Sequence, residues 1–329
     1  MGLRNGNATL TDEHGPVNPT QMLSRRELIR LSAMAGMTAA IGERMNFQIR
    51  TLLERAIPSS GERIPVVGLG TWQTFDVGTS TSERAPLARV LSAFADSGGR
   101  VIDSSPMYGR SEQVTGDLVT QLADDAARDR PFFIATKVWT TGRKAGIDQM
   151  ERSMRLLRTR RVDLMQIHNL VDADTHLRTL REWKEAGRVR YLGITHYHSG
   201  AYPGVERLLT REPLDFLQIN YSLAERDAER RLLPLAQERR VAVLINRPFA
   251  EGELFRRVRG QTVPSWASEF DCNTWGQFFL EFILSHPAVT AVIPATSNPE
   301  HMQDNLLAGR GRLPDEAQRR RMSEFMATL

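Results

Sequence analysis

Four residues able to do acid–base chemistry stand at the ends of short apolar runs or just beyond them. Asp103 ends one run and Tyr108 follows five residues later, while Lys137 and His168 come 29 and 31 residues further on in turn. A lysine beside a tyrosine stabilises the phenolate and lowers the phenol pKa from about 10 toward neutrality, and an aspartate holds such a lysine charged. A histidine can orient a carbonyl oxygen or assist proton transfer. Singly, each residue is more simply a cap, a rim charge or scaffold, but together they predict one acid–base site.

The elements that must bring these residues together are strands that alternate with helices. Between the apolar runs, hydrophobic residues recur at helical spacing, as at Leu87, Val90, Leu91 and Phe94. This alternation predicts an α/β fold, a (β/α)8 TIM barrel over residues 61–329, whose functional groups lie at the C-terminal ends of the strands. The eight predicted strands, which are continuous and aliphatic as buried strands are, fall at residues 65–71, 100–103, 132–136, 162–167, 191–195, 215–220, 241–246 and 290–294.

Two other classes of α/β protein are disfavoured by what the chain lacks. A doubly wound dinucleotide-binding fold usually carries G-x-G-x-x-G after its first strand, whereas residues 68–73 read GLGTWQ. A barrel lyase or hydrolase that used His168 and Asp103 with a metal would need about three clustered ligands. No such set of His, Asp and Glu occurs at the predicted strand ends.

The composition of the chain limits the classes of binding partner that we expect. The formal net charge is +4, and charged residues make up 25% of the chain in runs of mixed sign. Such runs form solvated helix faces, and without a basic stripe interleaved with aromatic residues we expect no nucleic-acid partner. Cys272 is the single cysteine, so no intrachain disulfide can form.

Three segments carry a resemblance to a known family. Residues 101–109 (VIDSSPMYG), 134–139 (IATKVW) and 162–169 (VDLMQIHN) are similar to the aspartate–tyrosine, lysine and histidine segments of the aldo-keto reductases. The resemblance implies an NAD(P)-dependent oxidoreductase that reduces an aldehyde or ketone to an alcohol, or the reverse, by hydride transfer. In that reaction a tyrosine is the general acid or base. The implied catalytic tetrad is Asp103, Tyr108, Lys137 and His168.

The same resemblance leaves one non-enzymatic alternative open. Some members of such a family could bind the cofactor but act as a sensor or a partner subunit, without turnover. The complete set of four residues argues against this alternative, because binding alone does not require a tyrosine and a lysine together.

By resemblance, later strand ends hold the cofactor. Two departures from the family pattern matter. Asn246 stands where an aromatic ring often lies under the nicotinamide, so Phe249 or Tyr221 must replace that ring or the stacking is lost. Ala295 and His301 stand where many members have a lysine and an arginine on the 2′-phosphate. We therefore expect NADPH as cofactor, with NADH as the alternative. The implied cofactor-binding residues are Thr195, His196, Gln218, Asn246, Arg247, Phe249, Thr296, His301, Asp304 and Asn305.

The expected substrate is a small-molecule carbonyl compound. Tryptophans near the strand ends are candidates for the walls of its pocket, since their large rings supply apolar contact area. The candidates are Trp72, Trp139 and Trp266.

Residues 1–60 are expected to form a flexible N-terminal extension, made of a disordered leader and a linker. Residues 24–42 open with SRRELI and continue into an uncharged run of 12 residues, which is too short for a bilayer span of about 20. The layout resembles a twin-arginine (Tat) export signal. It implies export to the periplasm or cell envelope, without a stable transmembrane span. The alternative is a cytoplasmic protein with an amphipathic leader.

Overall fold

The computed structural model describes residues 51–123 and 132–329. The predicted export signal at residues 24–42 lies outside these ranges. The predicted boundary at residue 60 differs from the structure, because a two-stranded antiparallel hairpin already begins at β1 (Glu54–Ala56) and continues into β2 (Arg63–Pro65). This hairpin was missed because each of its strands has only three residues.

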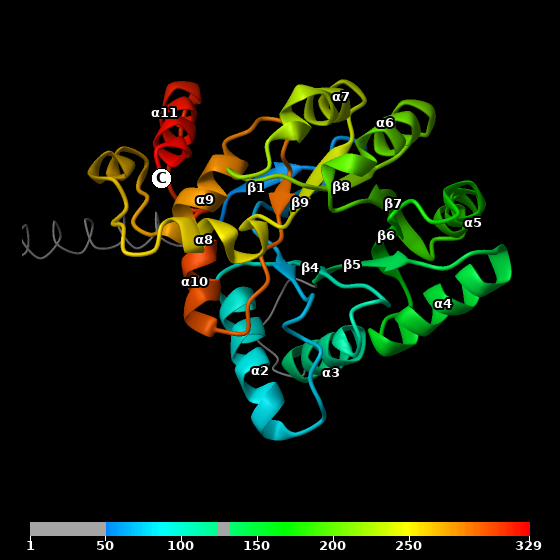
Figure 1. Cartoon of the computed structure of the whole chain (residues 1–329). Helices are drawn as coiled ribbons and strands as arrows, with labels where there is room; N and C mark the ends of the chain where they lie inside the picture. Colours follow the sequence, from blue (N-terminus) through cyan, green and yellow to red (C-terminus); the bar gives the residue numbers. More distant parts are fainter. Residues whose placement is uncertain (1–50, 124–131) are drawn as a thin grey trace, which may run out of the picture. The chain divides into compact units, whose positions relative to one another are not determined.

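A closed parallel barrel forms the centre of the described region, which confirms the predicted fold class (Figure 1). Its strands are hydrogen-bonded in chain order, and bridges from Val67 to Val292 and from Gly70 to Ala295 join the last strand to the first. Each predicted run contains one strand. The strands are β3 (Leu69–Gly70), β4 (Val101–Asp103), β5 (Phe133–Val138), β6 (Val162–His168), β7 (Val189–Thr195), β8 (Phe216–Asn220), β9 (Ala242–Asn246) and β10 (Ala291–Val292).

Glycine permits the closure of the barrel. A Cβ atom on Gly70 would lie 2.8 Å from the carbonyl oxygen of Ile293, which is closer than real Cβ contacts come. A side chain at this position would push the first and last strands apart. The glycines of the 68–73 segment therefore serve strand contact.

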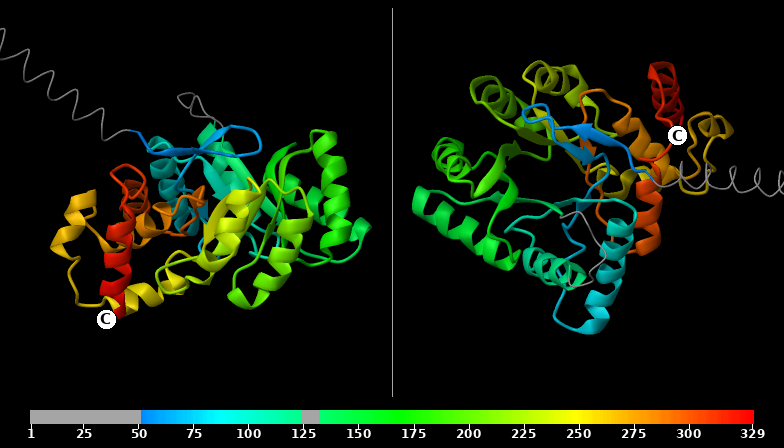
Figure 2. Two further views of the ribbon diagram at one scale, coloured as in Figure 1. Left: turned by 90° about the horizontal axis from the view of Figure 1, so that it is seen from above. Right: turned by 180° about the vertical axis from the view of Figure 1, so that it is seen from behind.

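The hairpin closes one end of the barrel (Figure 2). Ile57 and Ile64 are fully buried and belong to the cluster that fills the barrel interior with Phe133, Leu164 and Phe216. Because this end is plugged with apolar side chains, the polar site is left to the other end, where the strands finish.

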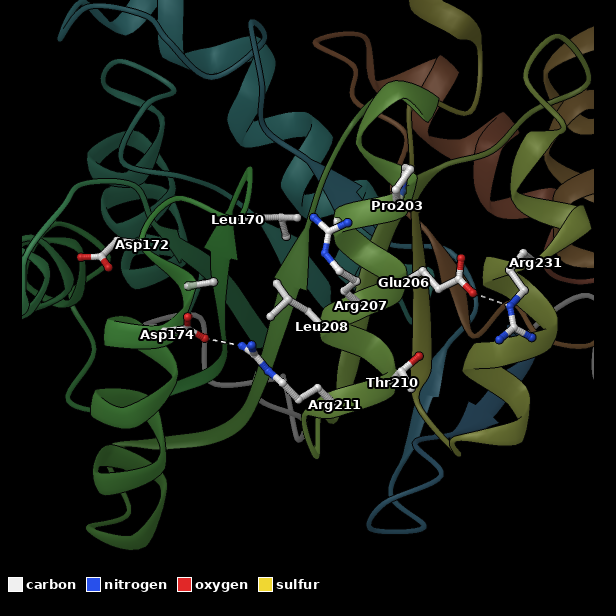
Figure 3. Close-up of a pocket in the computed structure, with 12 residues that line it drawn as sticks. Leu170, Asp172, Asp174, Pro203, Glu206, Arg207, Leu208, Thr210, Arg211 and Arg231 are labelled. Carbon is white, nitrogen blue, oxygen red and sulfur yellow. Dashed lines mark hydrogen bonds and ion pairs between the residues drawn. The ribbon is translucent and has the colours of Figure 1, made fainter.

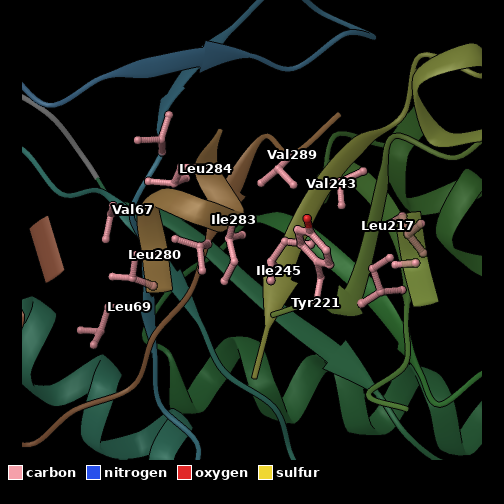
Figure 4. Packing of buried hydrophobic residues seen from close by; sticks show 14 of the residues in the cluster. Val67, Leu69, Leu217, Tyr221, Val243, Ile245, Leu280, Ile283, Leu284 and Val289 are labelled. Atoms are coloured by element: carbon pink, nitrogen blue, oxygen red, sulfur yellow. The ribbon is translucent and has the colours of Figure 1, made fainter. Parts of the chain in front are cut away.

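Helices cover the outside of the barrel and bury a second apolar layer against it. Tyr221, Ile245, Leu280 and Ile283 lie in this layer (Figure 4). The α-helices are α2 (Thr81–Asp96), α3 (Ser111–Ala123), α4 (Arg143–Leu156), α5 (Ala173–Glu185), α6 (Tyr202–Arg211), α7 (Leu232–Glu238), α8 (Glu253–Arg257), α9 (Trp275–Leu284), α10 (Pro299–Leu307) and α11 (Glu316–Ala327). Short 3-10 turns lie at Ser199–Ala201, Asp227–Arg230, Ala250–Gly252 and Ser265–Phe270. Within the described ranges, no helix is long and apolar enough to cross a membrane.

Candidate active site

Three neighbouring strands present the four predicted catalytic residues at one end of the barrel. Asp103 is the last residue of β4, Lys137 is the next-to-last residue of β5, and His168 is the last residue of β6. Tyr108 follows β4 in a turn closed by its own N–H, which donates to the carbonyl of Ser105 at 3.0 Å. The structure thus brings the four residues together.

The centre of the site is a buried ion pair. Lys137 Nζ lies 2.6 Å from Asp103 Oδ2 and donates to the carbonyl of Ser104 at 2.8 Å. Removing two charges from water is costly, and it is tolerated only when further hydrogen bonds satisfy the pair. Amides from two other strands do this, because Gln166 Nε2 and Gln218 Nε2 donate to Asp103 Oδ1 at 3.2 and 2.9 Å.

Lys137 keeps its charge in this setting. Burial alone would lower the pKa of Lys137, but Asp103 and Tyr108 outweigh burial and raise that pKa above its usual value. The ammonium group lies 5.0 Å from the centre of the Tyr108 ring. A permanent positive charge therefore stands beside the phenol.

The pKa of Tyr108 moves in the direction opposite to our prediction. Burial raises the pKa of Tyr108, and the neighbouring Lys137 offsets this only in part, while Asp103 adds to it. We predicted a value lowered toward neutrality, and this was wrong because the depth of burial is not visible in the sequence. The site holds a neutral phenol, which is the protonation state a proton donor needs.

His168 is a neutral imidazole between two aromatic rings. Its Nδ1 lies 3.0 Å from Ser105 Oγ, its ring meets the Tyr108 ring edge-on at 6.0 Å, and the Trp139 ring lies 6.5 Å away. Burial, Lys137 and His196 lower the pKa of His168 to about 2. The ring can therefore donate or accept a hydrogen bond without carrying charge.

The predicted nicotinamide-binding residues adjoin the tetrad. Thr195 Oγ1 donates to Gln218 Oε1 at 2.7 Å, so that Gln218 connects Thr195 with Asp103. Asn246 Nδ2 donates to the carbonyl of His196 at 3.1 Å, and Asn246 Oδ1 is buried without a hydrogen-bond partner among the described residues. An unused acceptor thus remains at the end of β9.

The rings offered as replacements for the missing aromatic residue are engaged elsewhere. Tyr221 is fully buried, and its hydroxyl is bonded to Arg319 at 2.8 Å and to Glu229. Phe249 packs against Phe255 at 4.9 Å. Tyr221 therefore belongs to the outer packing layer and cannot lie under a nicotinamide ring.

The predicted adenosine-binding residues lie in and just before α10, and one of them has another task. Asp304 accepts hydrogen bonds from Thr274 Oγ1 and Gln277 Nε2, both at 2.7 Å, so its carboxylate is occupied at the start of α9. Thr296 Oγ1 accepts from the N–H of Asn298 at 3.0 Å. His301 is exposed on α10, and Asn305 is buried in the same helix.

Arg247 follows β9 and is bonded within the rim. Its Nη1 donates to the carbonyl of Tyr197 at 3.1 Å, and its guanidinium lies 3.7 Å from carboxylate oxygens of both Glu225 and Glu251. Two carboxylates near one guanidinium reduce the charge available to a phosphate.

Two of the three candidate tryptophans stand free at the rim, and the third does not. Trp72 and Trp139 are 41% and 42% exposed. Trp266 instead packs against Phe270, Phe278 and Phe325 at 5.9–6.2 Å, with Arg321 over its ring. Its contacts are those of a packing residue, which spacing in the sequence could not distinguish from a pocket wall.

Three site residues were missed in the sequence, namely Ser105, Gln166 and Tyr197. Gln166 precedes His168 by two residues on one strand, so alternation puts both side chains on the same face, and this signal was available. Tyr197 is 45% exposed and stacks on His196 at 5.4 Å. Among the described residues, no three His, Cys, Asp or Glu side chains are grouped as metal ligands would be.

A groove of about 880 Å³ lies elsewhere, between α5 and α6 (Figure 3). Four of its charged side chains are paired with one another, in the ion pairs of Arg211 with Asp174 and of Arg231 with Glu206. None of the tetrad lines it, so it has no part in the chemistry derived above.

The fold and the site define a barrel oxidoreductase with a tyrosine proton donor, and comparisons with known proteins agree. The family model described as "Aldo/keto reductase family" matches residues 66–322. The chain therefore belongs to the aldo/keto reductase family, and it is an NAD(P)-dependent oxidoreductase acting on carbonyl groups.

Individual relatives are distant but extend over most of the chain. Methylglyoxal reductase YeaE of Escherichia coli is 26% identical over 261 residues, covering 77% of this chain and 88% of its own length. A thermostable aldo-keto reductase solved with the inhibitor epalrestat is 25% identical, with a TM-score of 0.68, over 83% of this chain and 99% of its own. An aldo-keto reductase from Klebsiella pneumoniae solved with NADPH is 23% identical, with a TM-score of 0.67, over 84% and 96%.

Proposed function

We propose that this protein reduces an apolar aldehyde or ketone to the alcohol with NADPH, and that Tyr108 donates the proton. The observation that carries the proposal is the buried ion pair of Lys137 with Asp103 beside a neutral phenol. A buried charge pair is costly to maintain. Its position next to Tyr108 favours a catalytic role over a structural one.

The residues at the ends of β7, β8 and β9 suit a nicotinamide. Asn246 Oδ1 is a buried acceptor without a partner in the described part of the chain, and His196 accepts the N–H of Tyr197 through Nδ1 at 3.0 Å, which leaves Nε2 as a donor. One acceptor and one donor match the two edges of a carboxamide. When bound, the cofactor would supply the hydride. The Klebsiella relative solved with NADPH supports the choice of cofactor.

The chain's own residues act on the substrate oxygen. Tyr108 donates its phenolic proton as negative charge grows on that oxygen, and Lys137 stabilises the phenolate left behind. Asp103 keeps Lys137 in place and charged, while His168 orients the oxygen from the other side. Positioned proton transfer of this kind contributes about two to four decades in rate.

An apolar substrate is supported by the side chains around the site. Four exposed apolar or aromatic residues stand on loops that follow β3, β4, β5 and β7, namely Trp72, Met107, Trp139 and Tyr197. Large apolar side chains exposed around one opening mark a binding surface. A sugar would leave most of its hydroxyl groups opposite these rings without partners.

The test is a turnover assay on the full-length protein with NADPH or NADH. The substrates are an aromatic aldehyde, the small dicarbonyl methylglyoxal and an aldose. We expect the aromatic aldehyde to give the highest kcat/KM. If the aldose were the best substrate, the apolar assignment would be wrong. Cofactor binding without turnover of any carbonyl would favour the silent sensor or partner-subunit alternative.

We further propose that residues 24–42 are a twin-arginine signal that sends the protein to the periplasm or cell envelope. Only the sequence supports this. The twin-arginine route carries folded proteins, so it suits an enzyme that acquires a dinucleotide inside the cell. Cytoplasmic residence with an amphipathic leader is the alternative.

A further inference from the structure

Ser105 is a buried serine that contacts the catalytic histidine. It lies two residues after the end of β4 and is fully buried. Its Oγ is 3.0 Å from His168 Nδ1 and accepts a hydrogen bond from the N–H of Met107 at 3.3 Å. Its carbonyl accepts the N–H of Tyr108. A single residue thus contacts both His168 and the turn that carries the proton donor.

The count of donors and acceptors decides which ring nitrogen of His168 carries the proton. A hydroxyl has one hydrogen and two lone pairs, and a neutral imidazole has one N–H and one lone pair. The N–H of Met107 already occupies one lone pair of Ser105 Oγ. If His168 Nδ1 is unprotonated, it accepts the hydroxyl hydrogen, so the Ser105 hydroxyl, Nδ1 and the N–H of Met107 are all paired.

The opposite tautomer leaves a group unpaired. If Nδ1 carried the proton, two N–H donors would point at Ser105 Oγ. The hydroxyl hydrogen would then face no acceptor within the part of the chain that the structure describes. An unpaired polar hydrogen in a buried position is unfavourable. Hydrogen bonding therefore selects the tautomer with the proton on Nε2.

We propose that Ser105 is a positioning residue that holds His168 in the Nε2–H tautomer and so provides the substrate oxygen with a second hydrogen-bond donor. The second half of this proposal rests on the proposed function, in which that oxygen lies between Tyr108 and His168. In the imidazole ring Nε2 is on the side away from Nδ1. Over the described residues, the His168 side chain has no hydrogen bond besides the one to Ser105.

Among the described residues, no other hydrogen bond to the His168 ring can replace that of the Ser105 hydroxyl. Two aromatic rings also adjoin the His168 ring, those of Tyr108 and Trp139, at 6.0 and 6.5 Å between centroids. Such ring contacts do not distinguish one nitrogen from the other. Because burial, Lys137 and His196 lower the pKa of His168 to about 2, the choice near neutral pH is between two neutral tautomers.

The experiment compares full-length wild-type protein with Ser105→Ala. The ¹⁵N resonances of the histidine rings are recorded without substrate, and a His168→Asn variant identifies the His168 signals. In the wild type we expect an unprotonated, hydrogen-bonded Nδ1 and a protonated Nε2. In Ser105→Ala the Nδ1 signal should move, because the ring loses the bond that fixes its tautomer and orientation.

Kinetics supply the second readout. Removing an aligned hydrogen-bond donor from an active site costs about two to three decades in kcat. Ser105→Ala keeps the His168 donor but no longer fixes its orientation, so kcat should fall about tenfold while the Kd for NADPH stays unchanged. Ser153→Ala is the matched control, since Ser153 is an equally buried serine bonded to the carboxylate of Glu112, away from the tetrad. Ser105→Cys keeps a weak hydrogen-bond donor, so its kcat should lie between those of the wild type and Ser105→Ala.

Two results would overturn the proposal. One is a wild-type spectrum in which His168 Nδ1 is protonated. The other is a Ser105→Ala protein that folds and binds NADPH but keeps both the His168 signals and kcat of the wild type. Failure of the proposed function would look different, because the wild type would then show the expected tautomer and reduce no carbonyl.

Discussion

Gln218 Nε2 donates to Asp103 Oδ1 at 2.9 Å, which connects the middle of β8 to the end of β4. The other end of the Gln218 amide accepts from Thr195, so an unbroken chain of hydrogen bonds runs from the predicted cofactor side to Lys137. Asp103 is the residue where this chain meets the charge that acts on Tyr108.

The first prediction concerns the proton donor. Tyr108→Phe should bind NADPH as the wild type does and lose about two to four decades of kcat, because it removes the phenolic proton that stands beside Lys137. Steady-state kinetics and a fluorescence titration of NADPH measure the two properties. A variant that kept more than about a tenth of the wild-type kcat would contradict the assignment.

The second prediction concerns the buried ion pair. Asp103→Asn leaves Lys137 buried without its counter-charge, and removing one partner of such a pair costs about 3–5 kcal/mol in the free energy of unfolding. Urea denaturation followed by circular dichroism measures this loss. The loss should be much smaller in the double variant Asp103→Asn/Lys137→Met, in which neither charge of the pair is left.

A matched control exists on the surface. Lys144 and Asp148 form an ion pair of the same length, 2.6 Å, with side chains that are 89% and 59% exposed. Water screens such a pair, so Asp148→Asn should leave the urea midpoint unchanged. Equal effects of the two aspartate substitutions would mean that burial is not what makes the Lys137 pair important.

The third prediction concerns the pH dependence of stability. Glu281 on α9 is buried, and one of its carboxylate oxygens has no hydrogen-bond partner within residues 51–123 and 132–329. Burial, followed by Asp271 and Asp304, raises the pKa of Glu281 to about 9 from an ordinary 4.5. The folded protein therefore binds a proton that the unfolded chain has released above about pH 4.5. Stability from this group is complete below that pH and is lost as pH rises toward 9.

Glu281→Gln removes this titration while keeping the shape of the side chain. At pH 8 the variant should be more stable than the wild type by about 5 kcal/mol, and the two should converge near pH 4. Urea unfolding at several pH values measures the difference. Glu324→Gln, at an exposed position on α11, is the control. A constant difference between variant and wild type at all pH values would refute the mechanism.

The fourth prediction concerns the choice of cofactor. Ala295 and His301 stand where the family resemblance places two cations on the 2′-phosphate, and Arg247 already lies near two carboxylates. Discrimination between NADPH and NADH should therefore be modest, and His301→Arg should raise the affinity for NADPH about tenfold, as one added charged hydrogen bond would. Gln303→Arg adds the same charge on another face of α10 and should change little. An NADPH preference above a few hundredfold in the wild type would contradict this view.

The sequence predicted the strands and the tetrad because both depend on local pattern. Continuous aliphatic runs identify buried strands, and Asp103, Lys137 and His168 each stand where such a run ends. What could not be predicted depends on depth and on distant partners. Burial reverses the expected pKa direction of Tyr108, and Arg319, far along the chain, engages the hydroxyl of Tyr221. The packing of Trp266 among three phenylalanines depends in the same way on residues distant in sequence.

The last prediction concerns export, and the structure sharpens its design. The hairpin that plugs the barrel begins at Glu54, so a reporter should be fused to residues 1–50, which leaves the hairpin out. The reporter is one that is exported only when folded. We expect export of the native fusion and its loss when Arg25 and Arg26 are both changed to Lys, because the twin-arginine route reads the arginine pair itself and not merely positive charge. A fusion of residues 1–50 with Arg30→Lys, which keeps the pair, is the control. If the native fusion stays in the cytoplasm, or the double-lysine form is exported equally well, residues 24–42 are an amphipathic leader and the enzyme works inside the cell.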